Sequence, residues 1–456
     1  MTSSSDLLAP LRSRSYLALL ALAAIIGVPI SAAAYGFLAL VTKMQEWIFT
    51  DLPKALAFHG EPLWWPVPPL VLAGLLVGLT IRFLPGTGGH SPADGFKAGA
   101  GPPTPAELPG VILAAFATLS LGVVLGPEAP LIALGGGLAF LALRLAKRDA
   151  PPRTGTVVAA AGSFAAISTL LGSPLLGAFL LMEASGVGGA TLELVLLPGL
   201  LAAGVGSLIF LGLNAWTGLG TFSLAIPHLP HFGAPDVAEF GWALVVGVAA
   251  ALVGSAIRRG ALLARRPVER RILVLTPVAG LAVAGLAIGY AAATGKGSSE
   301  VLFSGQDALG PFVAHSAQYA VGALLLLMAC KGIAYAVSLS SFRGGPIFPA
   351  MFVGAAGAMA LSHLPGLPLV PALGMGIGAM SATMLRLPMT SVLLPALLLA
   401  PDALAVTPLV IVAVVVAYVA SERLAPQAAD SRAEPAPAAG ETEVRPDGTA
   451  TAESRR

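Results

Sequence analysis

Long apolar runs, separated by glycine, proline and short charged loops, follow one another from about residue 15 to residue 422. They lie near residues 17–42, 66–84, 107–146, 156–183, 191–214, 238–260, 272–293, 316–340, 346–362, 367–385, 387–400 and 405–421. A helix needs about 17–25 mainly apolar residues to cross a bilayer core about 30 Å thick. Several runs have this length, and others are longer or shorter than one crossing. The pattern predicts an all-α, polytopic integral membrane protein with broken or re-entrant helices.

The composition indicates the same class of protein. Hydrophobic residues make up 56% of the chain and charged residues only 11%, whereas a soluble domain has about 25% charged residues. The net charge of +2 does not indicate a nucleic-acid partner, because the basic residues lie in short loops between apolar runs. We expect no metal and no cofactor, since the histidines have no metal-ligand spacing. The single cysteine excludes an internal disulfide framework.

The two ends of the chain differ from the membrane domain expected at residues 15–422. Arg12 and Arg14 precede the first apolar run, and Arg82 ends the second. Because Lys and Arg gather on the cytoplasmic side of a membrane, we expect a multi-pass protein of the cell membrane with residues 1–14 in the cytoplasm. Residues 425–456 contain almost no large apolar residue, which predicts a disordered cytoplasmic tail.

Three interruptions rich in glycine and proline lie within the apolar sequence. They are Gly86-Thr87-Gly88-Gly89-His90-Ser91-Pro92, Gly126-Pro127-Glu128-Ala129-Pro130 and Gly344-Gly345-Pro346-Ile347-Phe348-Pro349. Irregular backbone at membrane depth is tolerated only where it is buried in protein or lines a watery cavity. Glycine allows the backbone to approach a ligand closely, and proline suits the first turn of a following helix. Each motif therefore predicts the start of a half-helix.

Helix starts that converge can bind an anion without any cationic side chain. The first turn of a helix has unpaired N–H groups and the equivalent of about half a positive charge, and anions bind there. Discontinuous helices in the two halves of a chain also indicate the central site of a transporter. Glu128 lies in the second motif, where a carboxylate costs about 2.5–3.5 kcal/mol on membrane-insertion scales. We expect the helix end to stabilise this charge, so that Glu128 competes with an anion and protonation releases the site.

These motifs resemble those of the chloride channel and chloride/proton antiporter (ClC) family. Residues 126–130 are similar to its Gly-Lys/Arg-Glu-Gly-Pro, with Glu128 at the position of the gating glutamate. Residues 88–92 are similar to its Gly-Ser-Gly-Ile-Pro, and residues 345–349 to its Gly-x-Phe-x-Pro. The order and spacing also match at Pro174, Glu183 and Lys331. The resemblance covers about residues 15–422.

The resemblance implies the ClC fold, with two inverted-topology halves at about residues 15–214 and 238–422. It also implies a homodimer in the lipid bilayer with one anion pathway in each subunit. The substrate would be a small anion, chloride above all, moved by a channel or by exchange with protons, with Glu128 as the gate. The implied anion-binding residues are Gly88, Gly89, His90, Ser91, Gly126, Ala129, Ile347 and Phe348.

Some positions depart from the family pattern around the anion. Gly89 stands where the family has a serine whose hydroxyl binds the central anion, and Thr87 and Ser91 are the nearby hydroxyl groups. Pro346 stands where the family has a backbone N–H facing the anion, and proline has no such donor. Both changes remove donors that chloride uses. Fluoride or another small anion therefore remains an alternative substrate.

The proton pathway and the inner gate of the family are also altered. Glu183 matches the first of a pair of inner glutamates, and Ala184 replaces the second, which handles protons. This favours a channel or a loosely coupled exchanger. Tyr418 is the only tyrosine near the end of the membrane domain and thus the candidate for the family's central tyrosine. For both Glu183 and Tyr418 a plain structural role remains open.

Two other classes of function remain open from the residues alone. A membrane-embedded enzyme would use Glu128 or His90 on a lipid-like substrate, but the sequence has no convincing second catalytic group beside them. A non-transporting scaffold would not need a carboxylate among glycines and prolines. Anion flux by the purified protein separates both from a transporter.

Overall fold

The computed structural model describes residues 13–58, 60–96, 101–147, 151–168, 170–185, 190–218, 226 and 229–425. The described residues up to Leu424 belong to one compact unit. Residues 1–12 and 426–456 lie outside the described residues. The predictions of a cytoplasmic N-terminal segment and of a disordered tail at 425–456 therefore stay predictions.

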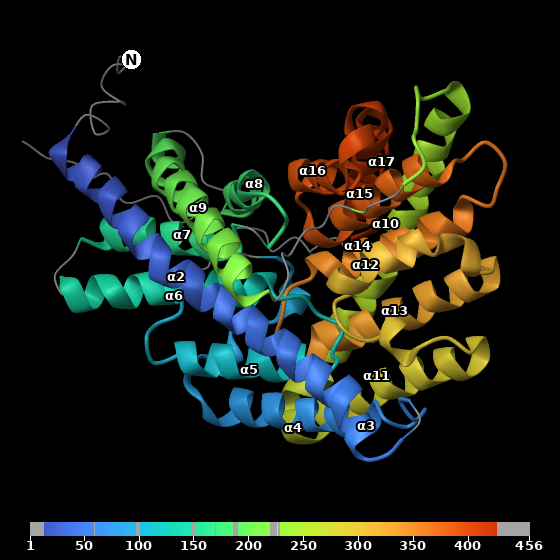
Figure 1. Cartoon of the computed structure of the whole chain (residues 1–456), viewed down its shortest axis with the longest axis horizontal. Helices are drawn as coiled ribbons and strands as arrows, with labels where there is room; N and C mark the ends of the chain where they lie inside the picture. The colour runs from blue at the N-terminus through green and yellow to red at the C-terminus, as the bar shows by residue number, and fades with distance from the viewer. Residues whose placement is uncertain are drawn as a thin grey trace, which may run out of the picture. The chain divides into compact units, whose positions relative to one another are not determined.

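All regular elements of the described chain are helices (Figure 1), which confirms the all-α prediction. Their bounds are α2 Arg14–Glu46, α3 Leu52–Ala55, α4 Val67–Phe83, α5 Leu108–Ser120, α6 Glu128–Ala146, α7 Pro152–Ile167, α8 Pro174–Ser185, α9 Ala190–Thr217, α10 Val237–Arg270, α11 Ile272–Thr294, α12 Gln306–Ala314, α13 Val321–Ser341, α14 Ile347–Leu361, α15 Leu369–Leu385, α16 Pro388–Leu398 and α17 Ala403–Leu424. Short 3-10 turns and one π turn join some of them.

The helices differ in length, as the uneven apolar runs predicted. Seven helical segments of the described chain are long and apolar enough to cross a membrane, and seven further apolar helices have only 10–17 residues. The apolar run at 107–146 divides into α5 and α6, because Gly122 adopts a positive φ of 95° and Gly126 and Pro127 follow it. The run at 156–183 divides into α7 and α8, and Pro174 begins α8.

The order and the packing of the helices repeat in two halves. In the first half α2 packs on α7 and α9, α5 leads into α6, and α6 packs on α7. In the second half α10 packs on α15 and α17, α13 leads into α14, and α14 packs on α15. Figure 1 shows α6, α7 and α9 on the left and α13, α15 and α17 on the right. This repetition agrees with the two-half architecture of the predicted fold.

Helices α4 and α11, one from each half, approach so closely that only glycine fits at their contact. A Cβ on Gly280 would overlap the carbonyl oxygen of Leu70, and a Cβ on Gly74 would lie 2.5 Å from the Cα of Pro277. Small residues allow this approach in a membrane, where van der Waals packing rather than the hydrophobic effect holds helices together. The two glycines therefore fix one of the contacts that join the halves.

Replacing Gly280 by alanine should destabilise the protein. The added methyl group has to displace the backbone of α4, and overpacking of this kind costs about 1–3 kcal/mol. Thermal unfolding of the purified protein in detergent should therefore show a lower midpoint. Gly285→Ala is the matched control, because a Cβ on Gly285 of the same helix has no atom within 4 Å. Equal midpoints for the two variants would contradict the close helix contact.

Candidate anion site

The second and third motifs meet in a reciprocal backbone contact. The N–H of Gly126 donates to the carbonyl oxygen of Gly345 at 2.7 Å, and the N–H of Gly345 donates to the carbonyl oxygen of Gly126 at 2.6 Å. Soon after this contact, α6 begins at Glu128 and α14 begins at Ile347. The pairing thus brings together the starts of two helices that belong to different halves of the chain.

The side chain of Glu128 lies against both glycines of this contact. A Cβ on Gly345 or on Gly126 would overlap the Oε2 atom of Glu128. A side chain at either position would therefore displace the carboxylate from this place. Ala129 follows in the first turn of α6, and its backbone N would lie 3.1 Å from a Cβ on Gly345.

The carboxylate of Glu128 is fully buried and occupies the N-terminus of α14. Its Oε1 accepts a hydrogen bond from the N–H of Phe348 at 3.0 Å, and the residue is 0% exposed. Its Oε2 has no donor among the described residues. A carboxylate bound by the N–H groups of a helix start occupies the position that a small anion would take.

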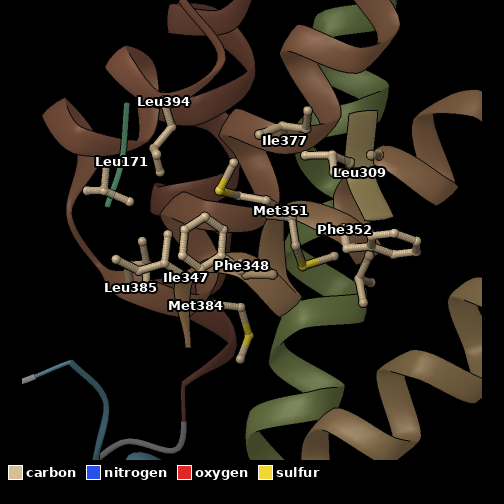
Figure 2. Close-up of a cluster of buried hydrophobic side chains, with 14 of the residues drawn as sticks. Leu171, Leu309, Ile347, Phe348, Met351, Phe352, Ile377, Met384, Leu385 and Leu394 are labelled. Atoms are coloured by element: carbon tan, nitrogen blue, oxygen red, sulfur yellow. The ribbon is translucent and has the colours of Figure 1, made fainter. Parts of the chain in front are cut away.

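Helix α14 is buried on all sides, so its N-terminus lies inside the protein. Residues 347–356 are all buried, and a helix that is apolar all round belongs in a core. Figure 2 shows Ile347, Phe348, Met351 and Phe352 of this helix among buried side chains from neighbouring helices. The donor that Glu128 uses is therefore shielded from bulk water.

Tyr335 is a residue of this site that the sequence pattern did not identify. It lies on α13, it is fully buried, and its hydroxyl donates to the carbonyl oxygen of Pro346 at 2.8 Å. Pro346 has no N–H, so its carbonyl group is its only polar backbone group. The bond from Tyr335 to this carbonyl oxygen orients the turn into α14. The only sequence signal for Tyr335 was that a single tyrosine lies in an apolar run about three helical turns before the third motif.

The first motif forms a tight turn, so the half-helix predicted there is wrong. Gly86, Thr87, Gly88 and Gly89 all have a positive φ, and four successive residues in this region cannot continue into a right-handed helix. In the part of the chain described up to residue 96, only the short 3-10 turn Pro92–Asp94 follows. The glycines of this motif therefore serve the turn.

Two other predicted site residues lie in this turn. Ser91 has a buried Oγ with no hydrogen-bond partner among the described residues, so its hydroxyl is available to a bound group. His90 is exposed beside it. The structure thus places a free hydroxyl two residues after Gly89, at one of the positions considered from the sequence.

Arg343 joins the first motif to the third, and sequence reasoning also missed it. It lies in the connection between α13 and α14, and its Nε donates to the carbonyl oxygens of Thr87 at 3.2 Å and Gly89 at 3.1 Å. Its backbone N–H reaches the Oγ1 of Thr118 on α5 at 3.5 Å. An arginine at the edge of the glycine-proline motif was the only sequence signal.

Glu183 caps the N-terminus of α16. Its Oε1 accepts from the N–H of Met389 at 2.8 Å, and its Oε2 accepts from the N–H and the hydroxyl of Thr390 at 2.8 and 2.7 Å. Carboxylates are favourable at this end of a helix. Both oxygens are thus engaged in a structural role, and the proton role of Glu183 stays a prediction.

Tyr418, the candidate for the inner gate, lies on α17 and is partly buried. Its carbonyl oxygen accepts from the Oγ of Ser421 at 2.8 Å. Among the described residues no hydrogen bond joins its side chain to the three motifs. The gating role of Tyr418 therefore stays a prediction.

A buried lysine orders the segment that supports the second motif. The Nζ of Lys331 on α13 donates to the four carbonyl oxygens of residues 300–303 at 3.0–3.3 Å. It also lies 4.4 Å from the ring centroid of Phe352. The N–H of Phe303 donates in turn to the carbonyl oxygen of Gly122 at 3.1 Å, in the loop that leads to the second motif.

Comparison with known proteins identifies the family. The sequence profile of the family described as voltage gated chloride channel matches residues 73–422. The chain belongs to this family. It is 31% identical over 355 residues to the ion-transport protein YfeO of Salmonella schwarzengrund (strain CVM19633), covering 76% of this chain and 80% of that protein. It is 32% identical over 353 residues to YfeO of Escherichia coli O1:K1 / APEC, covering 76% and 79%.

Solved structures of ClC proteins resemble this chain. A slow cyanobacterial Cl−/H+ antiporter matches with a TM-score of 0.70 at 20% identity, over 90% of this chain and 95% of that chain. A CLC-type fluoride/proton antiporter matches with a TM-score of 0.65 at 20% identity, over 90% of this chain and 96% of that chain. The predicted ClC fold is confirmed. As a member of the voltage gated chloride channel family, the chain is a multi-pass membrane protein of anion transport.

Replacing Lys331 by methionine should strongly destabilise the protein. Methionine fills a similar volume but leaves the four carbonyl oxygens of residues 300–303 without their donor in a dry interior. A buried acceptor left without its donor costs about 1–3 kcal/mol, which unfolding in detergent should detect. Lys54→Met is the control, because Lys54 is exposed. A Lys331→Met protein as stable as this control would show that the carbonyl oxygens do not depend on the lysine.

Replacing Glu183 by alanine should weaken the start of α16. Loss of a helix cap costs about 1–2 kcal/mol, and the midpoint of thermal unfolding should fall accordingly. Glu46→Ala removes an exposed carboxylate that is paired only with Lys43 at the surface, and should change the midpoint little. If Glu183 handled protons without capping the helix, both variants would unfold at the same temperature.

Proposed function

We propose that the chain carries small inorganic anions, chloride above all, through a pathway in each subunit that Glu128 gates. The deprotonated carboxylate occupies the N-terminus of α14 and excludes anions from it. Protonation removes the charge, weakens the hydrogen bond to the N–H of Phe348, and leaves this donor free for an anion. Anion flux should therefore rise as the pH falls.

The contact between Glu128 and Phe348 is the observation that carries this proposal. A carboxylate and a halide have the same charge and accept the same N–H donors, so a position that holds one suits the other. No ion pair within the described residues involves Glu128. Its carboxylate is therefore held by backbone donors that an anion can use when the side chain leaves.

We propose donors for the anion from all three motifs. The N–H groups of Ile347 and Phe348 begin α14, and that of Ala129 lies in the first turn of α6. The unpartnered hydroxyl of Ser91 supplies a donor in place of the serine that Gly89 replaces. Backbone donors fixed by helix starts need little rearrangement when an anion enters.

Proton coupling is weak or absent in this proposal. Ala184 cannot carry a proton, and both oxygens of Glu183 are engaged by the start of α16. A proton arriving at Glu183 would have to break this cap. We therefore favour a channel or a loosely coupled exchanger over a tightly coupled antiporter.

Fluoride is the second candidate substrate. Gly89 and Pro346 remove two of the donors that the resemblance assigns to chloride, and the fold also matches a CLC-type fluoride/proton antiporter. Fluoride is smaller than chloride and accepts stronger hydrogen bonds, so fewer donors can hold it. Flux measured for each anion in turn distinguishes the two substrates.

We further propose a homodimer in the plasma membrane with a cytoplasmic N-terminus, on the basis of the family resemblance and the positions of Arg14 and Arg82. A membrane-embedded enzyme is disfavoured, because no titratable side chain of the described residues is hydrogen-bonded to Glu128. The described residues also contain no group of three or more His, Cys, Asp and Glu side chains that could hold a metal ion.

Glu128→Gln should abolish the pH dependence of anion flux. Glutamine keeps the shape of the side chain but cannot change its charge, so the gate no longer responds to protons. Purified protein in liposomes loaded with chloride should release it when a potassium ionophore is added, and external chloride and pH can be recorded together. Wild-type efflux should increase at low pH, whereas efflux through Glu128→Gln should be constant.

Glu46→Gln is the control for this experiment, because Glu46 is an exposed carboxylate far from the three motifs in the chain. It should keep the pH response of the wild type. A Glu128→Gln protein that retains this response would exclude Glu128 as the gate. Proton movement that follows chloride against its own gradient would instead establish exchange.

A further inference from the structure

The anion site described above lacks two donors that the family pattern has. Gly89 has no hydroxyl, and Pro346 has no N–H. The turn of the first motif also directs the carbonyl oxygens of Thr87 and Gly89 toward one point, where they bind the Nε of Arg343. Carbonyl oxygens repel an anion, so this part of the site requires a compensating donor.

Arg343 is the residue placed to compensate for these losses. It directly precedes the third motif, in the connection between α13 and α14. It binds the two carbonyl oxygens of the first motif and, through Nη1, the carbonyl oxygen of Phe342 at 3.1 Å. A guanidinium here neutralises the carbonyl dipoles of the first motif.

The guanidinium of Arg343 has donors to spare. Arginine has five N–H groups in a planar fork, and the described residues supply acceptors only for Nε and Nη1. The Nη2 group has no partner there, and it is not among the buried unpartnered atoms. Arg343 is also partly exposed. Its free N–H groups therefore open onto accessible space beside the first motif.

No carboxylate of the described chain forms an ion pair with Arg343. Glu269 and Asp94 act on Arg343 only electrostatically, and both form ion pairs with Arg265. The charge of Arg343 is therefore uncompensated by a direct partner. Arginine forms charge-assisted hydrogen bonds to anions that are roughly twice as strong as neutral ones.

We propose that Arg343 binds the permeating anion directly, as a specificity residue that adds a charged donor beside the hydroxyl of Ser91. The ligand class is a small monovalent inorganic anion. The inference deepens the proposed function and rests on it, since it assigns a second binding position along the pathway gated by Glu128. The anion meets the free N–H groups of Arg343 at the first motif and the amide of Phe348 at the start of α14.

A structural role alone predicts something different. If Arg343 only fastens the two motifs together, its replacement lowers stability but leaves the anion affinity of the folded protein unchanged. Arg343→Gln and Arg343→Lys separate these roles. Glutamine retains an uncharged NH2 group, and lysine retains the charge without the planar fork.

The test measures chloride affinity by titration calorimetry in detergent and by the chloride dependence of efflux from liposomes. Arg343→Gln should weaken chloride binding about tenfold or more, as expected for a lost charge-assisted hydrogen bond, and Arg343→Lys by less. Arg259→Gln is the matched control, because Arg259 is exposed and also binds a backbone carbonyl, that of Leu424. It should leave the affinity unchanged.

A second measurement uses the wild-type protein, so it stands even if a variant fails to fold. Phenylglyoxal modifies accessible guanidinium groups, and mass spectrometry can follow Arg343 and Arg259 separately. Chloride at saturating concentration should slow the modification of Arg343 but not that of Arg259. Equal rates with and without chloride would overturn the proposal.

The possible failures are distinguishable. Wild-type protein can transport chloride with a pH response that depends on Glu128 while Arg343→Gln binds chloride as tightly as the control. That result would contradict only the role proposed for Arg343. If wild-type protein neither binds nor transports chloride, fluoride or nitrate, the proposed function and this inference fall together.

Discussion

The reciprocal hydrogen bonds between Gly126 and Gly345 are the contact on which the site depends. They join the segments that lead into α6 and α14, so the starts of two helices from different halves face one volume. The same contact leaves room for a carboxylate only because neither residue has a side chain. Backbone at membrane depth must satisfy its polar groups within the protein, and this pairing does so for Gly126 and Gly345, while the N–H of Phe348 binds the side chain of Glu128. The position of Glu128 follows from this geometry.

The surroundings explain why a charged group can be held there. Helix α14 is buried over its first ten residues, and Tyr335 fixes the carbonyl oxygen of Pro346 just before it. The helix start thus cannot shift to follow the side chain of Glu128. A rigid donor set binds an anion or a carboxylate with little reorganisation, which is the physical basis for competition between the two.

Two cations serve the irregular backbone around the motifs in the same way. Lys331 binds the carbonyl oxygens of residues 300–303, and Arg343 binds those of Thr87 and Gly89. Both segments lie outside regular helices, so their carbonyl oxygens have no partner along the chain. Lys331 uses all its donors in this role, whereas Arg343 does not. This difference distinguishes the structural role of Lys331 from the anion-binding role proposed for Arg343.

The sequence by itself determined the class of protein and the helical fold and singled out Glu128 as a candidate, because apolar length and glycine-proline breaks act locally. It predicted the divided run at 107–146 and the helix starts at Glu128 and Ile347, since these depend on neighbouring residues. Only the tertiary structure decided which side chains meet. The first motif is a turn because four successive residues adopt a positive φ, and Glu183 is a cap because α16 begins beside it. Tyr335 and Arg343 joined the site through contacts between segments far apart in the chain, and no local pattern encodes such contacts.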